Sequence, residues 1–251
     1  PLVTCGACPF CSAGQDNLCT KRQIISMAPR EGGFAEYIVM QERNLVGVPD
    51  NVALSIAALA EPIACGWHAV RKAKAALYKK NDCIRTLVIG GGAIGIGAAL
   101  SCNAQGIKDV VITEPNVLRR KYIENHCALR AIDSEALRSK ELFDLVVDGV
   151  GYETTRELAS KHALPGGVIA HIGLGSAIGG LDVRRMTLQE ITFFGTYTYT
   201  AQDFRDTAQA IFDGRLGNLG WTEQRPLQHG QNAFSDIHAG LVASPKIILN
   251  P

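Results

Sequence analysis

Four cysteines lie close together near the start of the chain, in the segment VTCGACPFCSAGQDNLC. Their spacing, Cys5-x2-Cys8-x2-Cys11-x7-Cys19, predicts a zinc ion held by four thiolates, because two-residue gaps let neighbouring sulfur atoms converge on a tetrahedron. Protein ligands would fill all four positions, so this zinc would be structural rather than catalytic. An iron–sulfur cluster and a thioredoxin-like redox pair are the alternatives for the same cysteines.

The remaining cysteines favour a reducing compartment. Cys65, Cys83, Cys102 and Cys127 are scattered through apolar or helical sequence, as buried reduced thiols are. Secreted disulfide scaffolds are small and poor in core residues, whereas this chain has 251 residues and is 47% apolar. We therefore expect a cytoplasmic protein.

The charge pattern narrows the range of partners. Lys and Arg number 25 against 24 acidic residues, without a basic stripe that could follow a nucleic acid. The chain also contains no apolar run of about 18 residues, the length that a membrane span needs. We expect a small-molecule substrate and neither nucleic acid nor membrane as a partner.

A second stretch suited to chemistry is IRTLVIGGGAIGIGAAL, where an apolar run ends in Gly90-x-Gly92-x-x-Gly95 and helical sequence follows. A second apolar run, DVVIT, then ends in Glu114. This order predicts a βαβ unit that binds a dinucleotide. Gly90 would permit the tight turn, Gly92 the close approach of a pyrophosphate, and Gly95 the close packing of helix on strand. The alternative is a glycine-rich turn that only connects a strand to a helix.

Glu114 is expected to determine whether the protein prefers NAD or NADP. A carboxylate there would accept hydrogen bonds from the ribose hydroxyls of NAD and repel the 2′-phosphate of NADP. Arg119 and Arg120 lie one turn further along and could soften that repulsion. The residues therefore favour NAD, with NADP as the alternative.

The remainder of the chain continues the alternation of strands and helices. We expect strands at 143–151 (FDLVVDGVG) and 168–174 (VIAHIGL), joined by a helix through TTRELASKHAL and a turn at PGG. Strands this rich in Val, Ile and Leu predict an α/β fold with a doubly wound parallel sheet. The predicted cofactor contacts lie at the carboxyl ends of the strands: Gly90, Gly92, Ala93, Ile94, Gly95, Glu114, Arg119, Val150, Gly151, Gly173 and Leu174.

Six motifs, CGACPFCSAGQDNLC, GGFAEYIV, AEPIACGWHAV, LVIGGGAIGIG, FDLVVDGVG and PGGVIAHIGL, occur in this order over almost the whole chain. Together they resemble the zinc-dependent medium-chain alcohol dehydrogenase family, and within it the sorbitol and polyol dehydrogenases. The resemblance implies a Rossmann domain at 63–199, a partial GroES-like, β-rich catalytic domain at 1–62, and a return to that domain at 200–251. It also implies an NAD-dependent oxidoreductase acting on a secondary alcohol, such as a polyol, sugar alcohol or sugar acid.

The pair Glu61-Pro62 carries the resemblance to the polyol branch, where the matching glutamate approaches the catalytic zinc. Glu61 is therefore the candidate catalytic residue and a candidate zinc ligand. Pro62 suits the first turn of a helix, which predicts Glu61 as the N-cap residue; a plain capping role is the alternative. Cys65 and His68 share its helix face, but His68 would lie ~10 Å further along the axis, so both are assigned to packing. The other histidines are expected at surface or hydrogen-bonded positions: His126, His162, His171, His229 and His238.

The chain also departs from the family pattern. Relatives carry a catalytic cysteine and a Gly-His-Glu motif before the zinc loop, and this sequence begins at Pro1 without them. We expect a partial record of a longer, active enzyme with two zinc ions. The alternatives are a truncated, inactive module with one zinc, a non-enzymatic NAD-binding scaffold, and a zinc-free quinone reductase.

The tract 181–200, LDVRRMTLQEITFFGTYTYT, alternates Thr, Phe and Tyr as a strand at a sheet edge does. In the family this region helps to join subunits, so a homodimer or homotetramer is expected; a strand buried within the monomer is the alternative. Four polar side chains of this tract could contact a substrate, the cofactor or a second subunit, and we assign them no specific role: Arg184, Arg185, Tyr197 and Tyr199.

Overall fold

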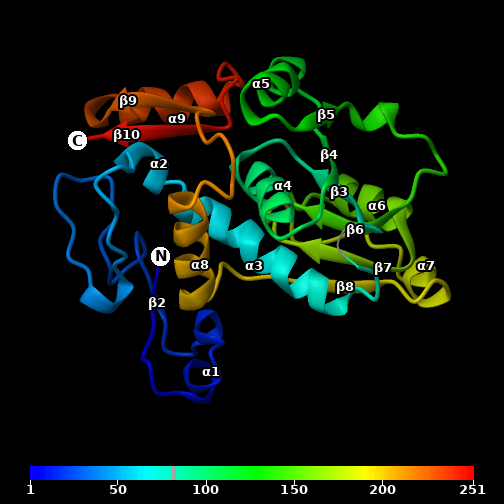
Figure 1. The fold of residues 1–251 in the computed structure, drawn as a ribbon, viewed down its shortest axis with the longest axis horizontal. Coiled ribbons are helices and arrows are strands. Elements are labelled where there is room, and N and C mark those ends of the chain that lie inside the picture. The colour runs from blue at the N-terminus through cyan, green and yellow to red at the C-terminus, as the bar shows by residue number, and fades with distance from the viewer. Residues whose placement is uncertain (81–82) are drawn as a thin grey trace.

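The computed structural model describes residues 1–80 and 83–251. Its centre is a parallel sheet with the strand order β5-β4-β3-β6-β7-β8, in which α helices connect most successive strands (Figure 1). The strands are β3 (Arg85–Ile89), β4 (Asp109–Thr113), β5 (Arg130–Ile132), β6 (Phe143–Asp148), β7 (Ala163–His171) and β8 (Thr192–Gly195). This is the doubly wound order, with its switch point between β3 and β6. The predicted α/β fold with a parallel sheet is confirmed.

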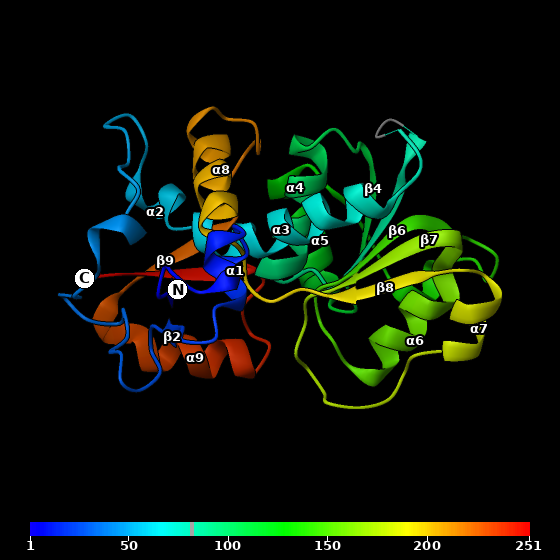
Figure 2. The same ribbon diagram turned by 90° about the horizontal axis from the view of Figure 1, so that it is seen from below.

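Helices cover both faces of the sheet. Figure 2 shows α3 (Ala60–Ala76) and α4 (Ala93–Ala104) on one side, and α6 (Glu153–His162) and α7 (Val183–Leu188) on the other. Successive residues of a strand therefore enter different cores: Val88 packs in one cluster and Leu87 in the other. Burial on both faces explains why these strands are almost continuously apolar.

Two helices approach each other at glycines on the first face. A Cβ atom on Gly66 of α3 would lie 2.4 Å from the backbone nitrogen of Ala98 in α4, and one on Gly97 would lie 3.0 Å from the Cα of Ile63. Helix α3 also packs against α8 (Ala201–Phe212). Helix α3 therefore connects the sheet to the region that contains Glu61.

The other elements are small, and most lie at the end of the molecule opposite α7 (Figure 1). β1 (Leu2–Val3) pairs with β2 (Gln23–Ile24) in antiparallel fashion, and β9 (Thr222–Pro226) pairs with β10 (Lys246–Asn250) in parallel fashion. The remaining helices are α1 (Pro9–Ser12), α2 (Leu54–Ala57), α5 (Val117–Cys127) and α9 (Gly230–His238), with 3-10 turns η1 (Asp16–Leu18), η2 (Glu42–Asn44), η4 (Ser134–Ala136) and η5 (Leu227–His229). Within residues 1–80 and 83–251, every helix is too short or too polar to cross a membrane.

The sequence-based boundaries were wrong around the PGG motif. Helix α6 ends at His162, and β7 begins at Ala163, so the expected turn at 165–167 lies inside the strand. The register between β6 and β7 is irregular there, and Gly166 has φ +69°. The glycines therefore accommodate a local irregularity in a continuing strand.

The predicted strands also end earlier than expected. β6 ends at Asp148 and β7 at His171, because the chain turns away there to form the loops at the edge of the sheet. In the tract 181–200, residues 183–188 are helical, since the side chain of Asp182 accepts a hydrogen bond from the backbone N–H of Arg185 at 2.8 Å. Only residues 192–195 form a strand, and in the described chain this strand lies at the edge of the sheet.

Candidate functional site

The glycine-rich turn joins β3 to α4 in the predicted way. The N–H of Gly90 donates to the carbonyl of Thr113 at 2.8 Å, and its φ of +98° requires a residue without a side chain. Gly92 is the N-cap of α4 and receives no side-chain cap, and a Cβ atom there would meet no described atom within 4 Å. The first turn of α4 thus presents backbone N–H groups beside open space, the usual arrangement for binding a phosphate.

Gly95 has the packing role that its place in the motif predicts. A Cβ atom on Gly95 would lie 1.8 Å from the carbonyl oxygen of Gly90, so only glycine fits between the turn and the helix. Ala93 and Ile94 are half-buried at the start of α4, next to the open space at Gly92. Their contact with a cofactor stays a prediction.

Glu114 is buried, with 5% of its surface exposed, and its carboxylate binds backbone N–H groups of the glycine-rich turn and of its own loop. Its Oε2 accepts a hydrogen bond from the N–H of Gly91 at 2.9 Å, and its Oε1 accepts one from the N–H of Asn116 at 2.9 Å. A Cβ atom on Gly91 would lie 2.6 Å from Ile123 Cδ1. The sequence prediction missed Gly91, although three consecutive glycines mark it.

The two arginines after Glu114 differ in what they bind. Arg120 donates to the carbonyl of Glu114 at 2.6 Å and to Asp133 Oδ2 at 2.9 Å, so it belongs to the loop itself. Arg119 donates through Nη2 to the carbonyl of Val242 at 3.3 Å. Its buried Nε finds no hydrogen-bond acceptor among the described residues, which leaves one donor for a further group.

The loops after β6 and β7 are in direct contact with each other. Asp148 is fully buried, and its Oδ1 accepts hydrogen bonds from the N–H groups of Val150 at 3.0 Å and Gly151 at 2.9 Å. A Cβ atom on Gly151 would lie 2.2 Å from the carbonyl oxygen of Gly173, so these two glycines permit the contact. Leu174 follows with 91% of its surface exposed. The sequence prediction named the glycines and missed Asp148, which anchors them.

Strand order brings these loops to one edge. β4, β3, β6 and β7 are neighbours and run parallel, so the loops that follow them all leave the same edge of the sheet. The crevice at the carboxyl edge of a doubly wound sheet is where dinucleotides bind. The structure thus gathers most of the predicted cofactor residues at a suitable edge.

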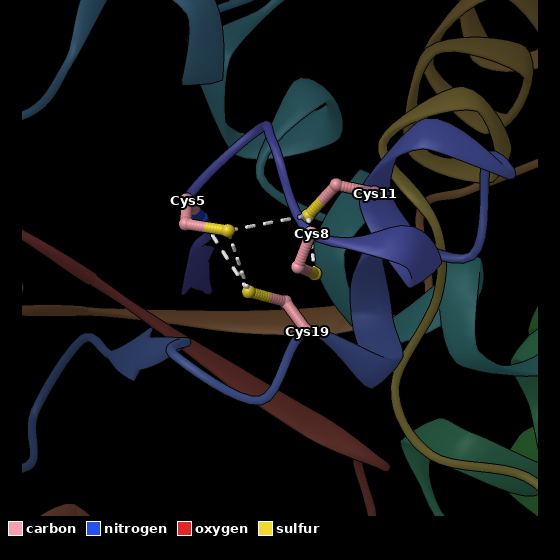
Figure 3. Close-up of side chains that lie close together, drawn as sticks. All are labelled: Cys5, Cys8, Cys11 and Cys19. Carbon is pink, nitrogen blue, oxygen red and sulfur yellow. Dashed lines mark hydrogen bonds between the residues drawn. The ribbon is translucent and has the colours of Figure 1, made fainter.

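The four clustered cysteines also converge. Figure 3 shows their sulfur atoms facing a common centre, and all four lie within 4.8 Å of one another. The Sγ–Sγ distances are 4.0 Å between Cys5 and Cys11, 3.5 Å between Cys8 and Cys11, and 3.6 Å between Cys5 and Cys19. The eight cysteines of the described chain are free thiols, so no disulfide competes for these four.

This geometry fits zinc. A tetrahedron of thiolates with Zn–S bonds of about 2.3 Å has sulfur atoms about 3.8 Å apart, and the observed distances scatter around that value. The N–H groups of Ala7 and Cys8 donate to the sulfur of Cys5 and lower its pKa to about 6, whereas burial raises the pKa of Cys11 to about 11. Of these two ligands, Cys5 therefore forms the thiolate more readily. Among residues 1–80 and 83–251, this is the one cluster of at least three metal-ligand side chains.

Glu61 lies in the first turn of α3, but not at the predicted place. The helix begins at Ala60 with Leu59 as the N-cap, so Glu61 is the second helical residue and Pro62 the third. The N-cap prediction was wrong by two positions, because a proline without an N–H fits anywhere in the first turn. The Oε1 of Glu61 accepts a hydrogen bond from the hydroxyl of Tyr199 at 3.1 Å. A cavity of about 310 Å³ lies beside both residues.

Cys65 is half-buried and His68 is buried, which agrees with their assignment to packing. Burial raises the pKa of Cys65 to about 12, so its thiol stays protonated. His68 is buried, and its Nδ1 lies 2.7 Å from Oδ2 of Asp203. The prediction missed Asp203 entirely, since nothing near it in the sequence marks a partner 135 residues away.

Two assignments of dispersed residues need correction. The Nε2 atom of His171 is buried without a hydrogen-bond partner in the described structure, at 3.6 Å from Asp148 Oδ2, so the expected hydrogen-bonded position was wrong. Burial lowers the pKa of His171 against the opposing charge of Asp148. Cys83 is exposed rather than buried, because it precedes β3 at the surface.

The other histidines fit the expectation. His162 is buried, and its Nδ1 lies 2.7 Å from the carbonyl of Glu141. His126, His229 and His238 are exposed.

Comparison with protein families gives two matches. Residues 93–213 match the zinc-binding dehydrogenase family, and residues 1–50 match the GroES-like domain of alcohol dehydrogenases. The first match covers the helix after the glycine turn and most of the sheet, and the second covers the cysteine cluster.

Individual relatives are longer than this chain. A probable diacetyl reductase ((R)-acetoin forming) of Saccharomyces cerevisiae is 33% identical over 83% of this chain, which spans 52% of that protein. The (R,R)-butanediol dehydrogenase of the same yeast is 28% identical over 97% of this chain, which spans 67% of it. Among solved structures, acetophenone reductase from Geotrichum candidum in complex with NAD superimposes with a TM-score of 0.86 at 27% identity, covering 99% of this chain and 71% of that one.

Proposed function

Because the chain belongs to the zinc-dependent medium-chain alcohol dehydrogenase family, we propose that it forms the NAD-binding and structural-zinc parts of an enzyme that transfers a hydride between a secondary alcohol and NAD. The observation that carries this proposal is the β3–α4–β4 crossover, in which bare N–H groups of α4 lie beside open space and a buried Glu114 follows the next strand. NAD, when bound, supplies the hydride acceptor.

The chain's own residues would position the cofactor. The N–H groups at Gly92, Ala93 and Ile94 would bind the pyrophosphate, since the positive end of the α4 dipole lies there. The loops at Gly151 and Gly173 would confine the nicotinamide half of the cofactor. The exposed side chain of Leu174 would cover it and exclude water.

Glu114 would select NAD over NADP. Each of its carboxylate oxygens accepts one backbone hydrogen bond and keeps a lone pair for a ribose hydroxyl. A 2′-phosphate would bring negative charge against a buried carboxylate. The unmatched Nε of Arg119 is a donor for the same nucleotide half.

The cysteine cluster would hold the structural zinc. Four thiolates close its coordination, so the ion would fix the loop of residues 5–19 without taking part in the reaction. A catalytic zinc would need further ligands beside Glu61. Among the described residues, Glu61 does not belong to a cluster of three or more metal-ligand side chains, so these residues alone do not form a catalytic zinc site. In the proposed reaction, Glu61 would face the substrate pocket with its carboxylate held by the Tyr199 hydroxyl.

The relatives guide the choice of substrate. Two of them are named for acetoin and butanediol, compounds with oxygen on neighbouring carbons, and other relatives are a sorbitol dehydrogenase and an L-galactonate-5-dehydrogenase. We infer a secondary alcohol with a neighbouring hydroxyl as the substrate class. A simple secondary alcohol without that group is the control.

The domain division at 1–62, 63–199 and 200–251 and a homodimer formed through β8 belong to the same proposal. Among the described residues, β8 is the edge strand of the sheet, and such an edge favours pairing with a second copy. Elution of the purified protein at the mass of a monomer in gel filtration would contradict the dimer.

The activity is tested on the full-length protein with a panel of vicinal diols, sugar alcohols, sugar acids and simple secondary alcohols, each with NAD and NADP. We expect turnover of a diol or polyol with NAD, at least 10-fold faster than with NADP. NADH binding without turnover of any alcohol would instead support a non-enzymatic NAD-binding module.

A further inference from the structure

The zinc loop is docked onto a short segment far away in the sequence, residues 197–201, which we call the tyrosine turn. The side-chain amide of Asn17 donates to the carbonyl of Tyr197 at 2.8 Å. Both carboxylate oxygens of Asp16 lie 3.1 Å from the N–H of Ala201, at the start of α8. A carboxylate at a helix N-terminus is electrostatically favourable, so the contact is suited to hold the two segments together.

A second contact links the cysteine cluster itself to the tyrosine turn. Arg22 donates through Nη1 to the carbonyl of Cys19 at 3.0 Å, and its guanidinium lies 4.7 Å from the centre of the Tyr197 ring. The side chain of Arg22 therefore connects Cys19 to Tyr197, in addition to the hydrogen bond from Asn17 to Tyr197.

The tyrosine turn has a strained backbone. Thr198 has φ +46°, which is rare for a β-branched residue, and its hydroxyl is buried without a partner among the described atoms. Such strain persists only where surrounding contacts hold the chain in place. Here it lets the carbonyl of Tyr197 bind the zinc loop while the side chain of Tyr199 reaches α3.

Tyr199 reaches Glu61 from a well-defined position. Only 6% of its surface is exposed, and its ring stacks on Phe204 with 5.6 Å between the ring centres. From there its hydroxyl donates a hydrogen bond to Oε1 of Glu61 at 3.1 Å.

The end of the tyrosine turn is fixed to the helix that carries Glu61. Asp203 lies in the first turn of α8 and accepts hydrogen bonds from Thr200 Oγ1 at 2.6 Å and from Arg71 Nε at 2.6 Å. Its Oδ2 lies 2.7 Å from His68 Nδ1. Arg71 and His68 belong to α3. Asp203 thus ties the segment that contains Tyr199 to α3, the helix that contains Glu61.

We propose that Tyr199 is a positioning residue for the Glu61 carboxylate, and that the zinc loop sets the place of Tyr199 through the Asn17 and Asp16 contacts with the tyrosine turn. The proposal rests on the proposed function of Glu61. It gives the cysteine cluster a consequence for the active site beyond stability.

The first test replaces only the hydroxyl. Tyr199→Phe in the full-length enzyme should lower kcat about 10-fold, since a hydrogen bond to a charged group is lost. NADH affinity and Tm should stay within error of wild type, because the ring and its stacking on Phe204 remain. Tyr78→Phe is the matched control, as Tyr78 is 74% exposed and distant from Glu61, and it should change nothing. An unchanged kcat in Tyr199→Phe would overturn the proposal.

The second test asks whether the zinc loop acts through Tyr199. Asn17→Ser should lower kcat about 5-fold in the wild-type background and less than 2-fold in the Tyr199→Phe background, because coupled residues are not additive. Equal losses in both backgrounds would contradict the coupling. If Asn17→Ser fails to fold, Asp16→Ala breaks the other contact from a half-buried position and should show the same dependence.

A readout independent of turnover comes from hydrogen exchange measured by mass spectrometry. Amide exchange in residues 197–201 should rise in Asn17→Ser and stay unchanged in Tyr199→Phe. Unchanged exchange in Asn17→Ser would overturn the docking role of the zinc loop. An inactive wild-type enzyme would instead refute the proposed function, and the exchange result would still decide the docking.

Discussion

The glycine-rich turn and the surroundings of Glu61 are built in opposite ways. The turn is made by consecutive residues between β3 and Glu114, and its shape depends on backbone atoms and on glycines that exclude side chains. The Glu61 site is assembled from three distant segments, near residues 16, 61 and 200, through side-chain hydrogen bonds. The shape of the glycine-rich turn is thus a local property of the chain, whereas the placement of Glu61 depends on the tertiary structure.

The two regions should therefore respond differently to mutation. A change in the turn should alter cofactor affinity and leave distant contacts intact. A change in the zinc loop or in α8 should spread to Glu61 through the tyrosine turn.

Loss of a metal ligand should have the largest effect. Cys19→Ser removes a buried thiol from the cluster, so the protein should lose its zinc and its Tm should fall by more than about 10 °C, as structural zinc contributes strongly to folding. Cys83→Ser makes the same change at an exposed thiol and should behave as wild type. Zinc content by mass spectrometry and thermal unfolding measure both. A zinc content per chain in Cys19→Ser equal to that of the wild-type protein would contradict the assigned ligand set.

Asp203→Asn should show that the Glu61 region depends on a buried ion network. Burial opposes the ionisation of Asp203, but hydrogen bonds from His68, Arg71 and Thr200 outweigh it and hold the pKa of this carboxyl well below its ordinary value. The variant should lose about 1.5–3 kcal/mol of unfolding free energy at pH 7, because the buried carboxylate loses its charge-assisted hydrogen bonds, while the half-exposed Arg71 can be hydrated.

The pH dependence of that loss follows from the direction of the shift. A lowered pKa stabilises the folded state fully above the unfolded pKa of about 3.9, and this contribution is lost as the pH falls further. The difference between wild type and Asp203→Asn should therefore shrink below about pH 4 in urea unfolding curves. A difference that grows on acidification would contradict this assignment.

Gly92→Ala should separate affinity from stability in the turn. A Cβ atom at Gly92 meets no described atom within 4 Å, so Tm should stay within about 2 °C of wild type. The added methyl group would occupy the space proposed for the pyrophosphate, and NADH affinity should fall about 10- to 100-fold. Gly47→Ala is the control, since a Cβ atom there is equally free and Gly47 lies outside the turn. Unchanged NADH affinity in Gly92→Ala would place the pyrophosphate elsewhere.

Glu114→Gln should give the smallest effect. The amide keeps one acceptor oxygen but cannot accept a second hydrogen bond at its nitrogen, so NADH should bind about 10-fold more weakly. The loss of negative charge should at the same time reduce the preference for NADH over NADPH. Fluorescence titrations with both cofactors measure this ratio, and an unchanged ratio would contradict the selective role of Glu114.

Much of the structure around the glycine-rich turn could be predicted from the sequence. The strands, the three glycines of the motif and Glu114 follow one another, and their spacing reflects backbone geometry that other residues cannot easily replace. The cysteine cluster was predictable for a similar reason, since its ligands are close in sequence and share one chemistry.

The support around Glu61 could not be predicted in the same way. The contacts of Tyr199 with Glu61 and of Asp203 with His68 join residues 138 and 135 positions apart, and short polar side chains carry no mark of a distant partner. The turn expected at PGG was placed wrongly for a related reason: β7 pairs with β6 on both sides of these residues, at Ala163 and again from Val168, so the irregularity lies within one strand. The expected N-cap at Glu61 failed because Pro62 is compatible with several positions in the first turn.

Calorimetric titration of the purified full-length protein with NADH measures whether the backbone between β3 and Glu114 binds the dinucleotide. We expect a single saturable site per chain with a Kd below about 1 mM. The absence of saturable binding at several times that concentration, in a sample that is folded and carries its zinc, would contradict it.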